Sequence, residues 1–403
     1  MYFRPAASAA FVLIAASAYP VKLPALDAQD PLTSPGFVHF YNNEYDQALD
    51  SFEEELKQRP ADPDCYDHIA QTILYREMYR NGALESELVT GGNPFLRRPK
   101  MEIAPEDKAR FEMSIDQALK LSAALLRKNP GDIQVLHAVV VAHALHANYE
   151  FLVERAWLDA LHDAIAARKA NEKILAIDPE WVDAHLVSGV TEYIFGSLPT
   201  YLRLLGAIRG FHGSKENGIR QLQWVAQSGI LDKYDARILL AAIYRRERDP
   251  QVAIPLLEQL VRTFPRNYLF RFEQVQMYSD LGDKRAALSV LAEVESLRCA
   301  GATGYANLAP EKIEYLTGNL LFWYGDLDPA LVNLRRVTEK ASGLDLNTAV
   351  MAWLRLGQVY DLKGDHQQAI EAYRQTVNTA PKSAAAAEAE NYIDTPYRRK
   401  PNA

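Results

Sequence analysis

Cysteine is scarce in this chain of 403 residues, and long apolar runs and an excess of positive charge are missing. The two cysteines, Cys65 and Cys299, are too few for a disulfide framework. No apolar run reaches the roughly 18 residues that a membrane-spanning helix needs. Lys and Arg number 44 against 52 Asp and Glu, so the net charge is −8. This acidic balance argues against a general nucleic-acid binder, because phosphate affinity depends on clustered Lys and Arg.

The first residues have the pattern of a targeting segment. Arg4 precedes a run of small and apolar residues from Ala6 to Ala18, which closes with Ala16-Ser17-Ala18. A short positive region, an apolar region and an A-x-A site are typical of a secretory signal peptide. We therefore expect cleavage after Ala18 and export to a bacterial periplasm or cell envelope. Residues 19–33 are rich in proline and predict a linker.

The remaining sequence contains internal repeats, and the clearest copy lies near the end of the chain. Its signature positions are Trp353-x2-Leu356-Gly357-x2-Tyr360, Gly364-Asp365, Ala369, Tyr373 and Pro381. This order is typical of a 34-residue helix–turn–helix repeat. Gly357 and Ala369 are small where two helices would cross closely, and Pro381 would end the second helix.

Other copies repeat the small residue in phase. Ala253 and Ala287 are separated by 34 positions (287 − 253), and further copies are centred on Ala48, Ala118 and Ala330. The chain therefore resembles the tetratricopeptide repeat (TPR) superfamily over most of residues 34–381. The resemblance implies an all-α fold, a right-handed superhelical solenoid of antiparallel helix pairs, which we place at residues 34–388. In such a solenoid each repeat is expected to bury its face only against its neighbours.

Three segments interrupt the repeat period, at residues 82–107, 149–162 and 196–218, and we expect a flexible tail at 389–403. Helical spacing of apolar residues predicts one extended helix over 149–177. Within the third segment, residues 198–208 have an apolar face that suits either a membrane-surface helix or packing inside the solenoid. Ser197-Leu198-Pro199 and Gly210-Phe211-x-Gly213 also resemble the tetratricopeptide repeat protein 39 family, which includes a yeast inclusion-body clearance protein.

Catalytic patterns are few. His143, His146 and Glu150 share one helical face and would suit zinc or iron, or polar packing between helices. Cys65 lies at a helix start without an evident base, and neither a nucleophile elbow nor a phosphate loop has the required spacing. We therefore predict a non-enzymatic protein without a cofactor, and keep a metal-dependent enzyme as the weaker alternative.

The TPR resemblance implies a concave groove lined by the first helix of each repeat. The residues that it places there are Arg245, Arg246, Phe272, Gln276, Tyr315, Asn319, Phe322, Trp323, Arg355 and Gln358. Aromatic rings beside arginine and amide groups suit an extended peptide, because the rings cover apolar side chains and the amides bind its backbone. We expect a scaffold that binds a protein or peptide partner and no nucleic acid. A peripheral membrane contact through residues 198–208 is the alternative.

Overall fold

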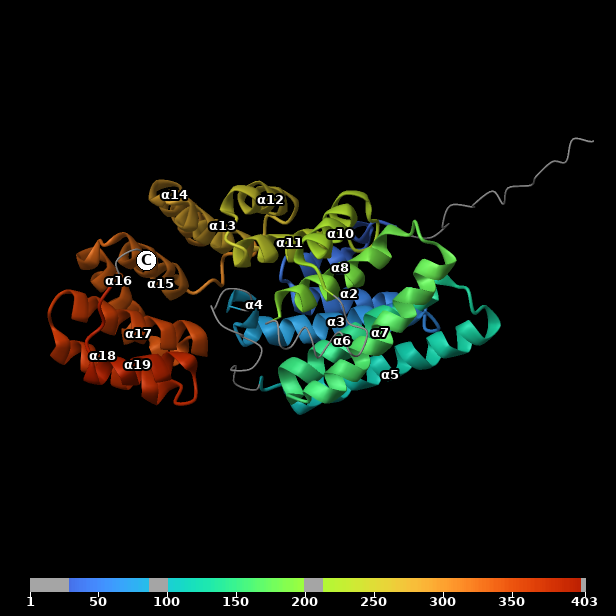
Figure 1. Ribbon diagram of the computed structural model, residues 1–403, viewed down its shortest axis with the longest axis horizontal. Coiled ribbons are helices and arrows are strands. Elements are labelled where there is room, and N and C mark those ends of the chain that lie inside the picture. The colour runs from blue at the N-terminus through green and yellow to red at the C-terminus, as the bar shows by residue number, and fades with distance from the viewer. Residues whose placement is uncertain (1–28, 87–100, 199–212, 400–403) are drawn as a thin grey trace, which may run out of the picture.

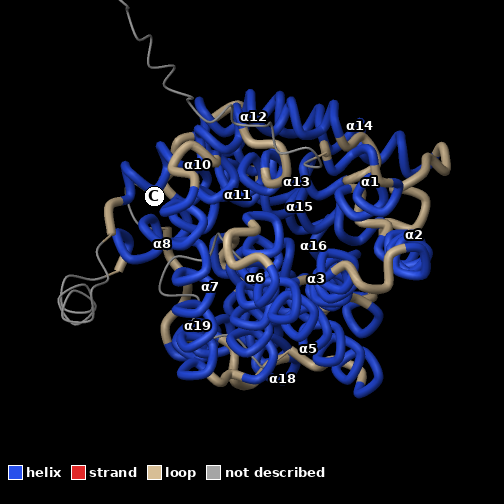
Figure 2. The backbone as a smooth tube through the Cα atoms, turned by 90° about the vertical axis from the view of Figure 1, so that its right-hand side faces the viewer, coloured by secondary structure: helices blue, strands red, loops and turns tan. Residues whose placement is uncertain are grey.

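A computed structural model describes residues 29–86, 101–198 and 213–399 of the chain. Within these ranges the regular elements are helices joined by loops and turns, as Figure 2 shows. The expected signal peptide and nearly all of the expected helix at 198–208 lie outside the described residues. No helix in the described ranges is long and apolar enough to cross a membrane.

The helices pack as consecutive pairs along the chain (Figure 1). A short 3-10 helix, η1 (Pro31–Thr33), precedes the first pair. The first four pairs are α1 (Pro35–Tyr41) with α2 (Tyr45–Gln58), α3 (Pro63–Arg80) with α5 (Pro105–Lys128), α6 (Ile133–Tyr149) with α7 (Trp157–Ile177), and α8 (His185–Ser197) with α10 (Lys215–Ser228). A single turn, α4 (Ala83–Ser86), follows α3, and η4 (Val182–Ala184) leads into α8.

Four further pairs and a last helix complete the described chain. They are α11 (Lys233–Arg246) with α12 (Pro250–Thr263), α13 (Tyr268–Leu281) with α14 (Lys284–Cys299), α15 (Pro310–Tyr324) with α16 (Leu327–Glu339), α17 (Leu346–Leu362) with α18 (His366–Thr379), and α19 (Ala384–Asp394). A 3-10 turn, η5 (Ala341–Gly343), joins α16 to α17. The expected fold, a right-handed superhelical solenoid of antiparallel helix pairs, is confirmed.

Small residues lie where paired helices cross, as the repeat pattern predicts. The in-phase alanines are all 0% exposed: Ala48, Ala118, Ala253, Ala287, Ala330 and Ala369. At Gly357 on α17, an added Cβ would lie 2.4 Å from the Cε1 of Tyr373 on α18. The ring therefore rests directly on the glycine backbone, and this contact requires a residue without a side chain there.

The first helix pair also packs against helices far along the chain, contrary to the expectation of neighbour-only contacts. The hydroxyl of Tyr41 on α1 donates to Asp235 on α11 (2.7 Å), and the ring lies 5.0 Å from that of Phe264. The Nδ2 of Asn267 donates to the Tyr41 carbonyl (2.9 Å), and Arg266 pairs with Glu44 (2.7 Å). These contacts hold the blue N-terminal helices of Figure 1 against α11 and the start of α13. The superhelix turns far enough for α1 to reach α11–α13 and bury its aromatic face there.

The extended helix expected over residues 149–177 is wrong. The helix α6 ends at Tyr149, a π-helical turn η3 covers Glu150–Glu154, and Arg155 adopts a left-handed conformation (φ 58°) before α7 begins at Trp157. Val153 is 2% exposed whereas Trp157 is 63% exposed. A straight helix would place these two residues on the same face, since they are one turn apart. The break therefore lets Val153 enter the core while Trp157 faces solvent.

The packed chain also continues past residue 388, where we expected the solenoid to end. The helix α19 extends to Asp394 and contacts both α17 and α18. Beyond it, the amide of Tyr397 donates to Asp361 of α17 (2.7 Å). The residues from 389 to 399 are thus held by defined contacts, because α19 covers the exposed face of the last repeat.

Candidate functional site

A cavity of about 580 Å³ lies on the concave side of the solenoid. Most of its wall comes from the first helices of successive pairs, including α1, α3, α6, α8, α11 and α13. Because α1 packs against α11–α13, the cavity wall joins the first helix of the described chain to helices much later in the sequence. The lining is mainly apolar, with residues such as Val140, Leu186 and Ile238. Cavities of this size that combine apolar walls with a few polar groups are typical binding sites.

An ion pair and two unsatisfied polar atoms lie on the cavity wall. Arg245 of α11 pairs with Glu273 of α13 through an Nη1–Oε1 contact of 2.6 Å. The Nε of Arg245 and the Oδ1 of Asn171 on α7 are buried without a hydrogen-bond partner among the described residues. Buried polar atoms normally have a partner. These two atoms remain unsatisfied within the wall, beside the Arg245–Glu273 ion pair.

A cluster of acids around one histidine forms another part of the wall. His137 on α6 pairs with Asp232 (Nε2–Oδ2, 3.1 Å), and Asp183 accepts from the amides of Ile230 and Asp232, both at 3.0 Å. Burial alone would lower the pKa of His137, but the Asp232, Asp64 and Asp183 carboxylates outweigh it and raise the pKa to about 9. The imidazole is therefore positively charged at neutral pH and partly neutralises the acids around it.

Asp235 adds a group that titrates near neutrality. Burial raises the pKa of this carboxyl to about 7, and the nearby Asp232 carboxylate adds to the increase. Its Oδ2 accepts the hydroxyl hydrogen bond from Tyr41, which closes the cavity wall between α11 and α1. The protonation of Asp235 is thus coupled to the contact that encloses the cavity.

The groove residues expected on α11 and α13 are only partly brought together. Arg245 lines the cavity, whereas the guanidinium of Arg246 lies 5.7 Å from the centre of the Tyr193 ring. Phe272 is buried against Tyr268, with ring centres 5.2 Å apart. Gln276 bonds Asp280 (3.2 Å) on the exposed side of α13. The residues of α13 that line the cavity are instead Leu269, Phe270 and Glu273.

The expected residues on α15 and α17 form a second cluster. The Nε of Arg355 donates to Asn319 (2.8 Å), and its Nη1 donates to Gln358 (2.6 Å). Its guanidinium lies 4.4 Å from the centre of the Phe322 ring and 4.7 Å from that of Trp323. Arg355 is buried, while Trp323 is 45% exposed. Tyr315 is half-buried and packs against the apolar core of these repeats.

The expected metal ligands have other partners. The Nδ1 atoms of His143 and His146 each lie 2.7 Å from a different oxygen of Asp163 on α7, and His146 Nε2 is 3.6 Å from Glu150. In the described part of the chain, no three histidine, cysteine or carboxylate side chains are placed to hold a metal ion. The two histidines instead link α6 to α7 through one carboxylate. This pairing is the polar packing that the sequence offered as the alternative.

Cys65 is a structural thiol in this fold. The side chain is buried at the start of α3. Burial raises the pKa of the thiol to about 12, and the neighbouring Asp62 carboxylate adds to this shift. The reactive thiolate is therefore suppressed.

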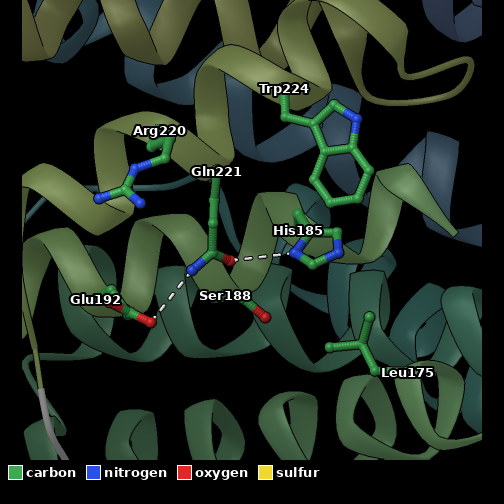
Figure 3. A pocket seen from close by; sticks show the side chains of 7 residues that line it. All are labelled: Leu175, His185, Ser188, Glu192, Arg220, Gln221 and Trp224. Carbon is green, nitrogen blue, oxygen red and sulfur yellow. Dashed lines mark hydrogen bonds between the residues drawn. The ribbon is translucent and has the colours of Figure 1, made fainter. Parts of the chain in front are cut away.

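A second pocket of about 610 Å³, which no sequence motif predicts, lies between α8 and α10 (Figure 3). Gln221 joins the two helices, since it lies 3.3 Å from His185 Nδ1 and donates to Glu192 (3.1 Å). The Trp224 ring lies 4.5 Å from that of His185. The residues that line this pocket belong to no sequence motif. They come together because α8 and α10 cross.

Two parts of the chain match family models of the tetratricopeptide repeat, at residues 238–300 and 351–383. The chain therefore contains tetratricopeptide repeats, as its internal pattern predicts. No curated protein matches the chain in sequence.

Solved structures with a similar course of helices have low identity. The yeast Tom70 structure is 12% identical with a TM-score of 0.40, and the match covers 91% of this chain and 88% of that chain. The human IFIT1 dimer with PPP-AAAA is 16% identical with a TM-score of 0.40, covering 84% and 69%. The P58(IPK) TPR domain is 14% identical with a TM-score of 0.22, covering 89% and 86%. These scores are too low to carry over a ligand or a partner.

Proposed function

We propose that this protein is a non-enzymatic scaffold that binds a segment of a partner protein in the cavity formed by its first helices. The observation that supports this proposal most directly is a cavity of about 580 Å³ whose mainly apolar wall comes from the first helices of successive pairs. Apolar side chains of a bound segment match most of this lining, and its backbone N–H and C=O groups can bind the polar side chains on the wall. Tetratricopeptide repeats as a class also favour a protein-interaction role over catalysis.

A photo-crosslinking residue in the cavity tests this function. A benzoylphenylalanine at Ile238, on the cavity wall of α11, is expected to capture one defined partner segment from an envelope extract of the source cells. The matched control carries the same residue at Val252, which is exposed on α12 and absent from the cavity wall. Mass spectrometry of the crosslinked peptide identifies the segment. Equal capture at both positions, or adducts with small molecules alone, would contradict the proposal.

A substitution that narrows the cavity gives a second test of partner binding there. Ile238→Trp adds bulk inside the cavity without changing a charged group, so the capture by a crosslinker at another wall position, Val187, should be lost. Val252→Trp on the outer side of α12 is the control and should leave capture unchanged. Persistent capture by a folded Ile238→Trp protein would show that the partner binds elsewhere.

We also propose that the scaffold acts in the bacterial cell envelope. The support is the pattern of residues 1–18, which has the charge, apolar run and A-x-A site of a secretory signal. The amino-terminal sequence of protein recovered from the envelope fraction should begin at Tyr19. A protein that retains Met1 and stays in the cytoplasm would contradict export.

A further inference from the structure

The segment after α19, residues 395–399, lies against the first helices α15 and α17 of the C-terminal repeats. The Tyr397 amide donates to Asp361 Oδ2 of α17, and its ring lies 6.0 Å from the Phe322 ring of α15. The Nη2 of Arg399 donates to the Phe322 carbonyl, and its guanidinium lies 5.2 Å from the centre of the same ring. The groove that the repeat pattern assigns to a peptide thus holds a segment of its own chain.

Two positions of this segment, 397 and 399, contact α15. Tyr397 is half-buried, and Arg399 contacts Phe322 although its side chain is exposed, as are those of Thr395, Pro396 and Arg398. Successive side chains of an extended chain point to opposite sides, so positions two apart face the same surface. The groove therefore contacts an aromatic residue, an arginine two positions later, and one backbone N–H.

The surface that receives the segment is held in place by other contacts. Asp361 also accepts the Tyr373 hydroxyl (2.7 Å) and lies 2.7 Å from His366 Nδ1, which fixes the carboxylate that binds the Tyr397 amide. The Phe322 ring is in turn supported by Arg355, which Asn319 and Gln358 hold. A rigid surface of this kind binds a peptide with little loss of its own conformational freedom.

We propose that the α15–α17 groove is a peptide-binding site for an extended segment with an aromatic residue and, two positions later, an arginine. Residues 395–399 are its internal ligand, and a partner segment of the same chemistry displaces them. The site is separate from the central cavity, because none of Phe322, Asp361, Tyr397 and Arg399 lines that cavity. Peptide binding at α15 and α17 is therefore independent of partner binding in the central cavity, which the proposed function concerns.

A peptide added in trans tests the site in the full chain. The probe is a fluorescent synthetic peptide of residues 394–399, acetylated and amidated, and its binding is followed by fluorescence anisotropy. In the Tyr397→Ala/Arg399→Ala protein the groove is vacated, so the probe should bind at least about ten-fold more tightly than to the unaltered protein, whose groove is mostly occupied. Arg398→Ala, at the outward position, is the matched control and should bind as weakly as the unaltered protein.

Peptide variants establish which groups are recognised. A probe with alanine in place of both Tyr397 and Arg399 should not bind the vacated groove, whereas alanine in place of Arg398 should leave binding unchanged. Circular dichroism and thermal unfolding establish that the double variant is folded. Failure of that folded protein to bind the probe, or equal binding to occupied and vacated grooves, would overturn the proposal.

Discussion

At the scale of single residues, the buried alanines set how closely paired helices approach. Ala287 on α14 is 0% exposed, and it lies in a cluster with Leu291, Val294 and Phe272. Packing at this density leaves no room for added methyl groups. The helix pairs therefore depend on small residues at these positions as much as on large apolar ones.

Enlarging one such alanine should destabilise the protein. We expect Ala287→Leu to lower the free energy of unfolding by about 1–3 kcal/mol, because the larger side chain forces the α13–α14 pair apart. Ala292→Leu, at an exposed position of the same helix, is the control and should change stability by less than about 0.5 kcal/mol. Urea unfolding measures both. Equal effects of the two substitutions would show that α14 does not pack as described.

His137 makes stability depend on pH. Its pKa is raised from 6.5 to about 9 in the folded protein, so the resulting stabilisation is fully present below pH 6.5 and is lost as pH rises through about 9. The free energy of unfolding should therefore fall between pH 7 and 9, and the lower end of this range overlaps the titration of Asp235, whose pKa is about 7. His137→Gln should flatten this part of the profile, whereas His162→Gln at an exposed position of α7 should not. An unchanged slope in His137→Gln would contradict the charge assignment.

The predicted groove residues lie on the first helices of their pairs, but not all of them line the cavity. Neighbouring residues of a helix differ in direction by roughly 100°. The repeat alignment placed Phe272 and Gln276 in the groove, yet neither lines the cavity, whereas Glu273 of the same helix does. The direction in which a side chain points depends on how far each helix pair is rotated against the next. That rotation results from packing between repeats, which the residues of one repeat do not determine alone.

At the scale of elements, Asn267 joins two roles at the start of α13. Its Oδ1 accepts from the Leu269 amide (3.0 Å) and so caps the helix, while its Nδ2 donates to the Tyr41 carbonyl on α1 (2.9 Å). The cap lies within α13, whereas the hydrogen bond to Tyr41 joins α13 to α1 and closes the cavity wall. One side chain thus couples the start of α13 to the position of α1.

Asn267→Ser separates these roles. Serine retains an N-cap acceptor for α13 but cannot reach Tyr41, so that carbonyl loses its donor at a cost of about 1–3 kcal/mol. We expect faster amide hydrogen exchange in α1 and α2 while α13 remains protected. The matched control is Asp283→Ser at the cap of α14, which does not contact α1. Unchanged exchange in α1 would contradict a stabilising role for this closure contact.

Helix pairing was predictable from sequence, whereas the closure was not. The 34-residue period identifies paired helices because both partners lie within one repeat. Contacts such as Arg266 with Glu44 join residues 222 positions apart and follow no motif. They result from the accumulated turn of the superhelix, and the same is true of the segment after α19 that returns to α15.

At the scale of the whole molecule, the apolar core is divided unevenly. One buried cluster joins residues from Phe40 to Met277, while another contains only residues from Leu321 to Ala389. A smaller cluster, from Tyr268 to Leu320, links them. The N-terminal part is closed by long-range contacts, and the C-terminal repeats continue from it as a linear array.

Because the core is divided in this way, we expect the N-terminal part and the C-terminal repeats to unfold as separate cooperative units. Ala118→Leu should destabilise by about 1–3 kcal/mol and increase hydrogen exchange throughout α1–α13, because the closed part unfolds as one unit. Ala369→Leu should increase exchange in α15–α19 alone, since repeats in a linear array depend on their neighbours. Hydrogen-exchange mass spectrometry measures both. Increased exchange of α1 in Ala369→Leu would contradict the division.

The contact between α1 and α11 also sets an order of events during synthesis. Tyr41 and Asp235 are 194 positions apart, and ribosomes add about 5–20 residues per second, so roughly 10–40 s separate their emergence. During that interval the Tyr41 ring of α1 lacks its later neighbours Tyr234 and Phe264, although Phe37 and Phe40 already have partners on α2 and α3. The first helix pair therefore completes its packing only after α11 and α12 have been made.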